Sequence, residues 1–163
     1  MFWLKQRLTN LEELLEMDYE KLFKNQKALS IYASPNMHHE AEQTIKREIM
    51  PRIREHEAEY WSLLRQFANG SEIAEPEAQI VIATLVQDTE IIQAKPMPDE
   101  VLQKLQELLD KLNEPGTAAV AKAKFAVNVI PGILAYEFEL DTENALRQAF
   151  RQLKQLFGVA AKK

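Results

Sequence analysis

The stretch LKQRLTNLEELLEMDYEKLFKNQKALSIY, residues 4–32, decides the fold of this chain. Its apolar side chains recur at helical spacing, and Glu and Lys fill the other face. The recurring set is Leu4, Leu8, Leu11, Leu15, Tyr19, Leu22, Leu29 and Tyr32. Such spacing places one apolar stripe along one side of a helix. It therefore predicts a single long amphipathic helix.

A second long stripe comes after a short turn. The segment Ser34-Pro35-Asn36 supplies that turn, because the residue before a proline avoids the α region and Asn36 can cap the next helix. The stripe contains Ala41, Ile45, Ile49, Ile53, Tyr60, Leu63, Leu64 and Phe67 and stops at Asn69-Gly70. Residues 1–69 are therefore predicted to form a long αα-hairpin. Because Pro51 removes a backbone donor, we expect a kink or break near residues 48–51.

The polar and acidic segment 70–76 marks the clearest boundary of the chain, and Pro76 is placed to open a helix. Residues 78–94 carry apolar side chains at helical spacing, although the β-branched run at 79–86 leaves a strand open as an alternative. The length of this segment without a turn signal favours a helix.

Three further helices are predicted beyond residue 95. The first covers the leucine stripe at 101–112; the second is Ala-rich, begins at a Thr117 cap, runs to about Ile130 and is central in its lobe. Pro131-Gly132 should interrupt the chain, and residues 133–140 should be helical or irregular, a short strand being the alternative. The third begins at Asp141 or Thr142 and stops at Gly158.

The fold class is thus predicted to be all-α: a long antiparallel helical hairpin, residues 1–69, followed by a smaller helical lobe, residues 76–158. The two parts are expected to pack as one body. At 163 residues the chain is long enough to bury a sizeable core.

Composition narrows the classes of partner. A net charge of −5 gives no long-range attraction to phosphate backbones, so nucleic acid is not expected as a partner. No apolar run reaches the roughly 20 residues of a membrane helix, and the amino terminus lacks the features of a signal peptide. The absence of cysteine fits a reducing compartment, and we expect a cytoplasmic location.

Candidate chemistry is sparse. His38 and His39 with Glu42 resemble half of a metal site, but the Glu-x-x-His order of a bundle di-iron centre is reversed, so no metal binding is expected. His56 lies near the core stripe and should be partly buried and hydrogen-bonded. The acids Glu137, Glu139, Asp141 and Glu143 lie around a helix start. With no phosphate-binding loop and no nucleophile elbow, we predict no catalytic residue, no cofactor and no enzymatic activity.

Two aromatic residues stand outside the first regular stripe. Phe2 and Trp3 precede it, so they either tuck under the second lobe or remain exposed for a partner. Ile31 and Tyr32 lie near the tip of the hairpin. These four residues are the candidate interaction surface.

Three stretches carry a resemblance to known modules. They are RIREHEAEYWSLL at 52–64, LDKLNEPGTAA at 109–119 and IPGILAYEFELDTE at 130–143. They resemble helical modules of cyanobacterial proteins that occur beside NACHT-type signalling ATPases, WD-repeat arrays or caspase-like and TIR effector domains. The resemblance spans about half of the chain and implies an adaptor or effector-associated module with no catalytic residues.

The sequence therefore favours a non-enzymatic helical interaction module that binds a protein partner or a second copy of itself. One alternative is a small-molecule sensor whose ligand lies between the two lobes. A metal-binding helical bundle is the other.

Overall fold

A computed structural model describes residues 2–31, 34–70, 72–136 and 140–162 of the chain. Side chains are described for the same residues except 140–145 and 158–162. Helices make up nearly all of these residues, and no strand occurs among them. The all-α prediction is confirmed, and the chain divides into two compact units, residues 1–60 and 61–163.

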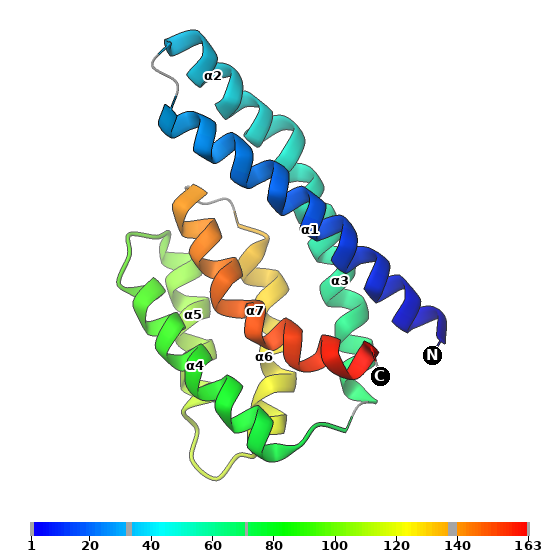
Figure 1. Cartoon of the computed structure of the whole chain (residues 1–163). Coiled ribbons are helices and arrows are strands. Elements are labelled where there is room, and N and C mark those ends of the chain that lie inside the picture. The colour runs from blue at the N-terminus through cyan, green and yellow to red at the C-terminus, as the bar shows by residue number, and fades with distance from the viewer. Residues whose placement is uncertain (1, 32–33, 71, 137–139, 163) are drawn as a thin grey trace. The chain divides into compact units, whose positions relative to one another are not determined.

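The first unit contains two long helical arms (Figure 1). One arm is α1, Phe2–Ile31, and the other consists of α2, Pro35–Thr44, a π-helical segment, Ile45–Ile49, and the first half of α3, Met50–Asn69. The predicted stripe of α1 is buried at Leu4, Leu8, Leu11, Leu15 and Leu22. Tyr32 lies outside the described residues.

The turn before α2 differs from the prediction at one position. Asn36 does not cap α2; Ser34 occupies the cap position with extended backbone, and Pro35 lies in the first turn. The carbonyl of Ser34 accepts the His38 N–H at 3.0 Å. Proline is well suited to a first turn and forces an extended residue before it, so the helix begins two residues earlier than a cap at Asn36 would place it.

The interruption expected near Pro51 is confirmed and takes the form of a π-helical turn. Residues Ile45–Ile49 adopt the wider helix, and the Met50 N–H donates to the Ile45 carbonyl five residues back. Proline lacks an N–H, and its ring clashes with the preceding turn of a regular α-helix. A wider turn just before Pro51 accommodates the ring without ending the helix.

The second unit joins the end of α3 to four further helices: α4, Glu75–Gln93, α5, Asp99–Leu112, α6, Ala119–Leu134, and α7, Leu140–Lys162. Residues 78–94 are therefore helical almost to their end, as predicted. In this unit α4 contacts α5, α6 and α7, and α6 also contacts α5 and α7 (Figure 1). The Ala-rich helix α6 is thus central in its lobe, with Ala123, Ala126, Val127 and Ile130 fully buried.

The boundary between the compact units does not coincide with a turn. It lies between Tyr60 and Trp61, inside α3, whereas the sequence places a boundary at the polar segment 70–76. Pro76 does lie in the first turn of α4, as expected. The domain assignment of residues 1–69 and 76–158, and their packing as one body, stay predictions.

The start of α6 is stabilised by a residue from another helix. Thr117 was the predicted cap, but the cap position belongs to Ala118, and the Thr117 hydroxyl donates to Glu114 Oε1 at 3.0 Å. The N–H groups of Ala119 and Val120 instead donate to the Glu75 carboxylate of α4, at 2.8 and 3.0 Å. The Thr117 prediction is therefore wrong, because a carboxylate reaches the positive end of α6 from α4.

Two predicted helix stops are also wrong. Pro131 lies inside α6, which continues to Leu134, and Gly158 lies inside α7, which continues to Lys162. A proline near a helix end interrupts few hydrogen bonds, so the last turn survives it. Gly132 faces α5 instead of ending α6: a Cβ there would lie 3.3 Å from Lys104 Nζ. Residues 135–136 leave the helix, and residues 137–139 lie outside the described part of the chain.

Thr89 of α4 provides a test of the core. It is fully buried, and its hydroxyl has no hydrogen-bond partner among the side chains and backbone that the structure describes. Because a buried unsatisfied hydroxyl is destabilising, Thr89→Val should raise the free energy of unfolding by about 1 kcal/mol. Urea denaturation would measure this change.

Thr84 on the same helix is the matched control for that substitution. Its hydroxyl donates to the Ile80 carbonyl at 3.2 Å and is more exposed, so Thr84→Val should change stability by less than about 0.5 kcal/mol. A Thr89→Val variant less stable than the wild type would show that the buried Thr89 hydroxyl is hydrogen-bonded.

Glu75 allows a pH test of the α6 cap. The N–H groups of Val120 and Ala119 lower the pKa of its carboxyl below the ordinary value of 4.5. The carboxylate therefore stabilises the fold fully above that ordinary value, and its contribution is lost as the pH falls through the lowered folded-state pKa. Glu75→Gln should lower the melting temperature at pH 7, and the deficit should shrink below pH 4.5, as thermal melts between pH 7 and pH 3 would show.

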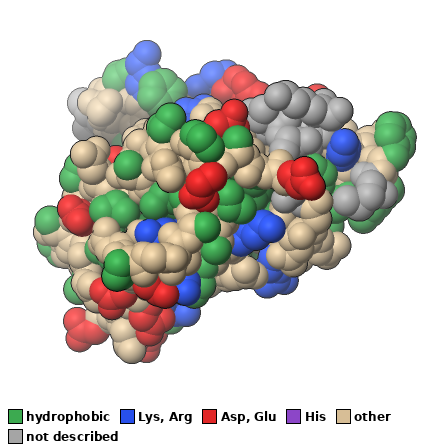
Figure 2. Space-filling view, turned by 90° about the horizontal axis from the view of Figure 1, so that it is seen from below, with side chains coloured by type: hydrophobic (Ala, Val, Ile, Leu, Met, Phe, Trp, Pro, Cys, Tyr) green, Lys and Arg blue, Asp and Glu red, His purple; other side chains and the backbone are tan. Residues whose placement is uncertain are grey.

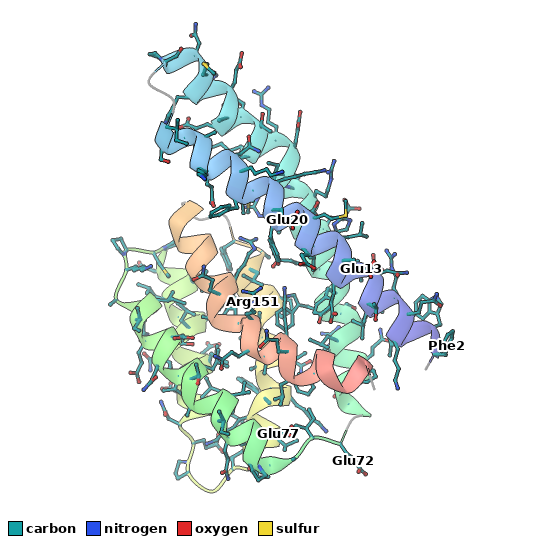
Figure 3. The ribbon with its side chains drawn as sticks, viewed as in Figure 1. Phe2, Glu13, Glu20, Glu72, Glu77 and Arg151 are labelled. Atoms are coloured by element: carbon teal, nitrogen blue, oxygen red, sulfur yellow. The ribbon has the colours of Figure 1, made fainter. Side chains whose placement is uncertain are left out.

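Glu77 is the matched control, since it lies in the same first turn of α4 and its side chain is exposed (Figure 3). Glu77→Gln should leave the melting temperature nearly unchanged at every pH. A Glu75→Gln deficit that does not vary with pH would mean that the carboxylate charge does not stabilise α6.

Candidate interaction surface

Helix α1 has two unlike apolar surfaces. Its leucine stripe is buried, whereas five large apolar side chains remain exposed: Phe2, Trp3, Met17, Phe23 and Ile31. Phe2 is 81% exposed and Trp3 67% exposed, which are high values for adjacent aromatic residues. Whether this pair packs against the second unit or binds a partner stays a prediction.

Four exposed residues of α1 lie nearly on one line. Phe2, Glu13, Glu20 and Ile31 are separated by 11, 7 and 11 residues, which correspond to about three, two and three helical turns. Figure 3 shows Phe2, Glu13 and Glu20 in succession along α1. This line has an apolar residue at each end and two carboxylates between them, and we call it the outer line of α1.

Polar pairs hold the inner face of α1 against α3. Arg7 donates to both carboxylate oxygens of Glu59, at 2.6 and 2.8 Å, and the Tyr60 hydroxyl donates to Glu12 Oε1 at 2.9 Å. Arg7 lowers the pKa of Glu59, and burial raises the pKa of Tyr60. Both pairs connect residues about 50 positions apart, so they fix which part of α3 faces which part of α1.

A further polar pair joins Asp18 of α1 to His56 of α3. The Asp18 residue is 4% exposed, and its Oδ2 lies 2.7 Å from His56 Nδ1. Arg52 Nη1 lies 4.0 Å from the other carboxylate oxygen. One residue further along each helix, the Tyr19 hydroxyl donates to the buried Glu57 at 2.8 Å. His56 is therefore partly buried and hydrogen-bonded, as predicted, and together with Arg52 it lies beside the buried Asp18 carboxylate.

The other histidines lie on a solvated helix. His38 Nδ1 is 3.4 Å from Glu42 Oε1, one turn along α2, and both side chains are well exposed. No group of three or more His, Cys, Asp or Glu side chains within the described ranges is arranged to hold a metal ion. The absence of metal binding and of a cofactor stays a prediction. The side chains of Glu137, Glu139, Asp141 and Glu143 lie outside the described residues.

The aromatic residues of α3 belong to the core. Tyr60, Trp61 and Phe67 are all at most 5% exposed, as their helical spacing predicts. In the second unit, Lys154 of α7 lies 5.7 Å from the centre of the Trp61 ring. Among the helices in the described part of the chain, none is long and apolar enough to cross a membrane.

The second unit has its own exposed features on α4. Ile80 and Ile91 are 69% and 63% exposed, and they were not among the predicted surface residues. An open hollow of about 460 Å³ lies between α4, the end of α5 and the start of α6. On the face seen in Figure 2, hydrophobic side chains alternate with charged ones, without one large apolar area.

Sequence reasoning identified Phe2, Trp3 and Ile31 but missed the other exposed apolar residues, including Met17, Phe23 and Ile80. Their signal is present in the sequence, because each lies out of phase with the buried stripe of its helix. Such residues can be identified from the sequence once the positions of the buried stripe are known.

No family model matches the chain, and no curated protein or solved structure does either. The resemblance to helical modules of cyanobacterial signalling proteins therefore rests on the three sequence stretches alone.

The Asp18–His56 pair predicts a non-additive effect on stability. His56→Leu should cost about 2 to 3 kcal/mol, because it leaves a buried carboxylate with only the more distant Arg52. Replacing both residues by leucine should recover at least half of that loss, since no buried charge remains. Urea denaturation at pH 7 of the two single variants and the double variant would measure the coupling.

The exposed His38–Glu42 pair is the control. Replacing His38 by leucine should change stability by less than about 0.5 kcal/mol, because exposed ion pairs contribute little. If the Asp18→Leu, His56→Leu variant loses as much stability as the two single variants together, the two side chains are not coupled.

Proposed function

We propose that the chain is a non-enzymatic helical protein-interaction module that binds through the outer face of α1. The observation that carries this proposal is the exposure of the adjacent aromatic residues Phe2 and Trp3 on a helix whose leucine stripe is buried from Leu4 to Leu22. Exposed aromatic side chains supply much of the binding energy of protein interfaces. The resemblance noted above supports the same role, that of an adaptor or effector-associated module.

The outer line of α1 also indicates the chemistry of the partner. Between Phe2 and Ile31 it carries the carboxylates of Glu13 and Glu20, so a complementary surface has basic side chains between two apolar contact points. The separation of Phe2 and Ile31, 29 residues, corresponds to about 43 Å along a helix. Such a span suits a long groove or a second helix lying beside α1.

Self-association in which the whole outer line of α1 pairs with that of a second copy is less favourable than binding to a basic partner. An antiparallel arrangement that sets Phe2 against Ile31 of another molecule also sets Glu13 against Glu20, and a parallel arrangement sets each carboxylate against itself. Like charges directly opposite each other are destabilising. The charge pattern therefore favours an unlike, basic partner over self-association, which the sequence alone leaves equally open.

Loss of the two aromatic residues should abolish binding. We expect a Phe2→Ser, Trp3→Ser variant to keep its helical circular dichroism but to lose the partner protein that the wild type captures from a lysate of the native organism. The expected reason is the loss of the exposed aromatic area. Sedimentation equilibrium of both proteins would measure self-association in parallel.

Two further variants make this test specific. Ile80→Ser, Ile91→Ser removes comparable exposed area from α4 and should leave capture unchanged. Glu13→Lys, Glu20→Lys should abolish capture of a basic partner while leaving the helix intact. A wild type that is monomeric and captures the same proteins as the Phe2→Ser, Trp3→Ser variant would exclude α1 as the interaction surface.

The remaining alternatives have fewer structural observations behind them. A sensor with its ligand between the two lobes and a metal-binding bundle both stay hypotheses, as do the cytoplasmic location and the absence of enzymatic activity and of nucleic-acid binding.

A further inference from the structure

The hollow in the second unit lies along one side of α4. The residues of α4 that line it are Glu75, Gln79, Ile82, Ala83 and Val86. They are spaced at helical intervals over 11 residues, or about 16 Å. Glu75 and Gln79 are at one end of this row, and Ile82, Ala83 and Val86 are at the other. The hollow is therefore elongated, with a polar end and an apolar end along α4.

The apolar end is supported by the packed core. Ile82 is 6% exposed and Leu112 is 2% exposed, so both are rigidly held from below while one side of each lines the hollow. Ala83 and Val86 are less buried and form a wall of small side chains. This surface can accept a hydrocarbon group without rearrangement of the core, because its residues are already fixed by packing.

The polar end contains a cation whose acidic neighbours are engaged elsewhere. Lys122 of α6 lines the hollow and interacts electrostatically with Glu75 and Glu114. The Glu75 carboxylate accepts the N–H groups of Ala119 and Val120, and the Glu114 carboxylate pairs with Lys111 at 3.1 Å. No carboxylate of the described residues lies within 4.0 Å of Lys122 in an ion pair.

A second polar group at the hollow can bind an oxygen ligand. Asn113, which comes directly after α5, lines it with an exposed side chain whose amide is not hydrogen-bonded to any residue described by the structure. Its N–H₂ group is a donor, as is the Lys122 ammonium. A ligand that accepts hydrogen bonds and carries a negative charge matches both.

We propose that this hollow binds a small amphiphilic monocarboxylate, with its carboxylate at Lys122 and its hydrocarbon part against Ile82, Ala83 and Val86. A volume of about 460 Å³ is within the range of small-molecule sites and accommodates a chain or ring of several carbons. The site lies wholly within the second unit and is independent of the outer line of α1. The proposed ligand site and the proposed interaction surface are separate, so an experiment can contradict one proposal without contradicting the other.

The length of the hydrocarbon part provides a quantitative signature. Each methylene group that becomes buried should tighten binding by about threefold to fourfold. Affinity should therefore rise from butanoate through hexanoate to octanoate, then level off once the apolar end of the hollow is filled. Octylamine, which has the same chain and the opposite charge, should bind much more weakly because Lys122 repels it.

The experiment is a titration of the ¹⁵N-labelled full chain with these probes, monitored by two-dimensional NMR. We expect saturable shifts of the Ile82, Ala83, Val86 and Ala119 amides with octanoate. Lys122→Gln should weaken octanoate binding by about tenfold, while the binding of octanol, added as an uncharged probe of the same chain length, should not change. Ala83→Trp, which fills the hollow from an exposed position, should abolish both.

Ile91→Ser is the matched control, since Ile91 is an exposed apolar residue of the same helix that does not line the hollow. It should bind octanoate as the wild type does. Thermal melts of each variant verify that it is folded. The proposal is overturned if octanoate shifts do not saturate, if octylamine binds as tightly as octanoate, or if Ala83→Trp binds like the wild type.

Discussion

The second arm of the hairpin covers the leucine stripe on the inner face of α1 in a single axial alignment. The polar pairs beside the stripe determine that alignment. Leucine contacts alone tolerate small displacements along a helix, because neighbouring leucines are nearly equivalent. A hydrogen bond between two particular side chains is lost when either helix is displaced along its axis. Arg7 with Glu59 lies near one end of α1, whereas Asp18 with His56 lies near its middle, so both pairs form together in only one alignment. The second arm of the hairpin must therefore remain helical past Pro51 to present His56 and Glu59.

Because the inner face of α1 is used for packing, only its opposite face is available to a partner. Its one buried carboxylate among the described residues, Asp18, is paired with His56 of α3, whereas Glu13 and Glu20 are exposed on the opposite face. The helix thus separates charges that serve the fold from charges that face outward. In the second unit α6 plays the corresponding structural role, since it contacts three other helices and is capped by one of them. Its amino-terminal end brings Lys122 beside α4 without requiring a loop to hold it.

Local patterns were sufficient to predict most of the helices, because each helix has a clear apolar period. The sequence also predicts that residues 78–94 are helical despite many β-branched residues, because the segment is long and contains no turn signal. The same reasoning failed at Thr117 and Pro131. A cap supplied by Glu75, 44 residues away, leaves no local signature, and whether a proline ends a helix depends on the packing of the next turn. Of the candidate surface, Phe2, Trp3 and Ile31 were identifiable from the stripe, but the amphiphilic hollow combines residues from three helices and was not.

The π-helical segment has a consequence for how the chain can change in length. Ala41, Ile45, Ile49 and Ile53 occur every four residues, and on a regular α-helix each such step drifts by about 40°. The wider turn at Ile45–Ile49 absorbs that drift, so Ala41 and Ile53 can face the same neighbour. A deletion of one residue here would restore regular helical winding and leave α3 in nearly the same angular position relative to α2, because the wider turn accommodates one extra residue. A second deletion would have no wider turn left to absorb it and would rotate α3 by about 100°, so that Ile53, His56 and Tyr60 would turn away from α1. The segment should therefore tolerate the loss of one residue but not of two.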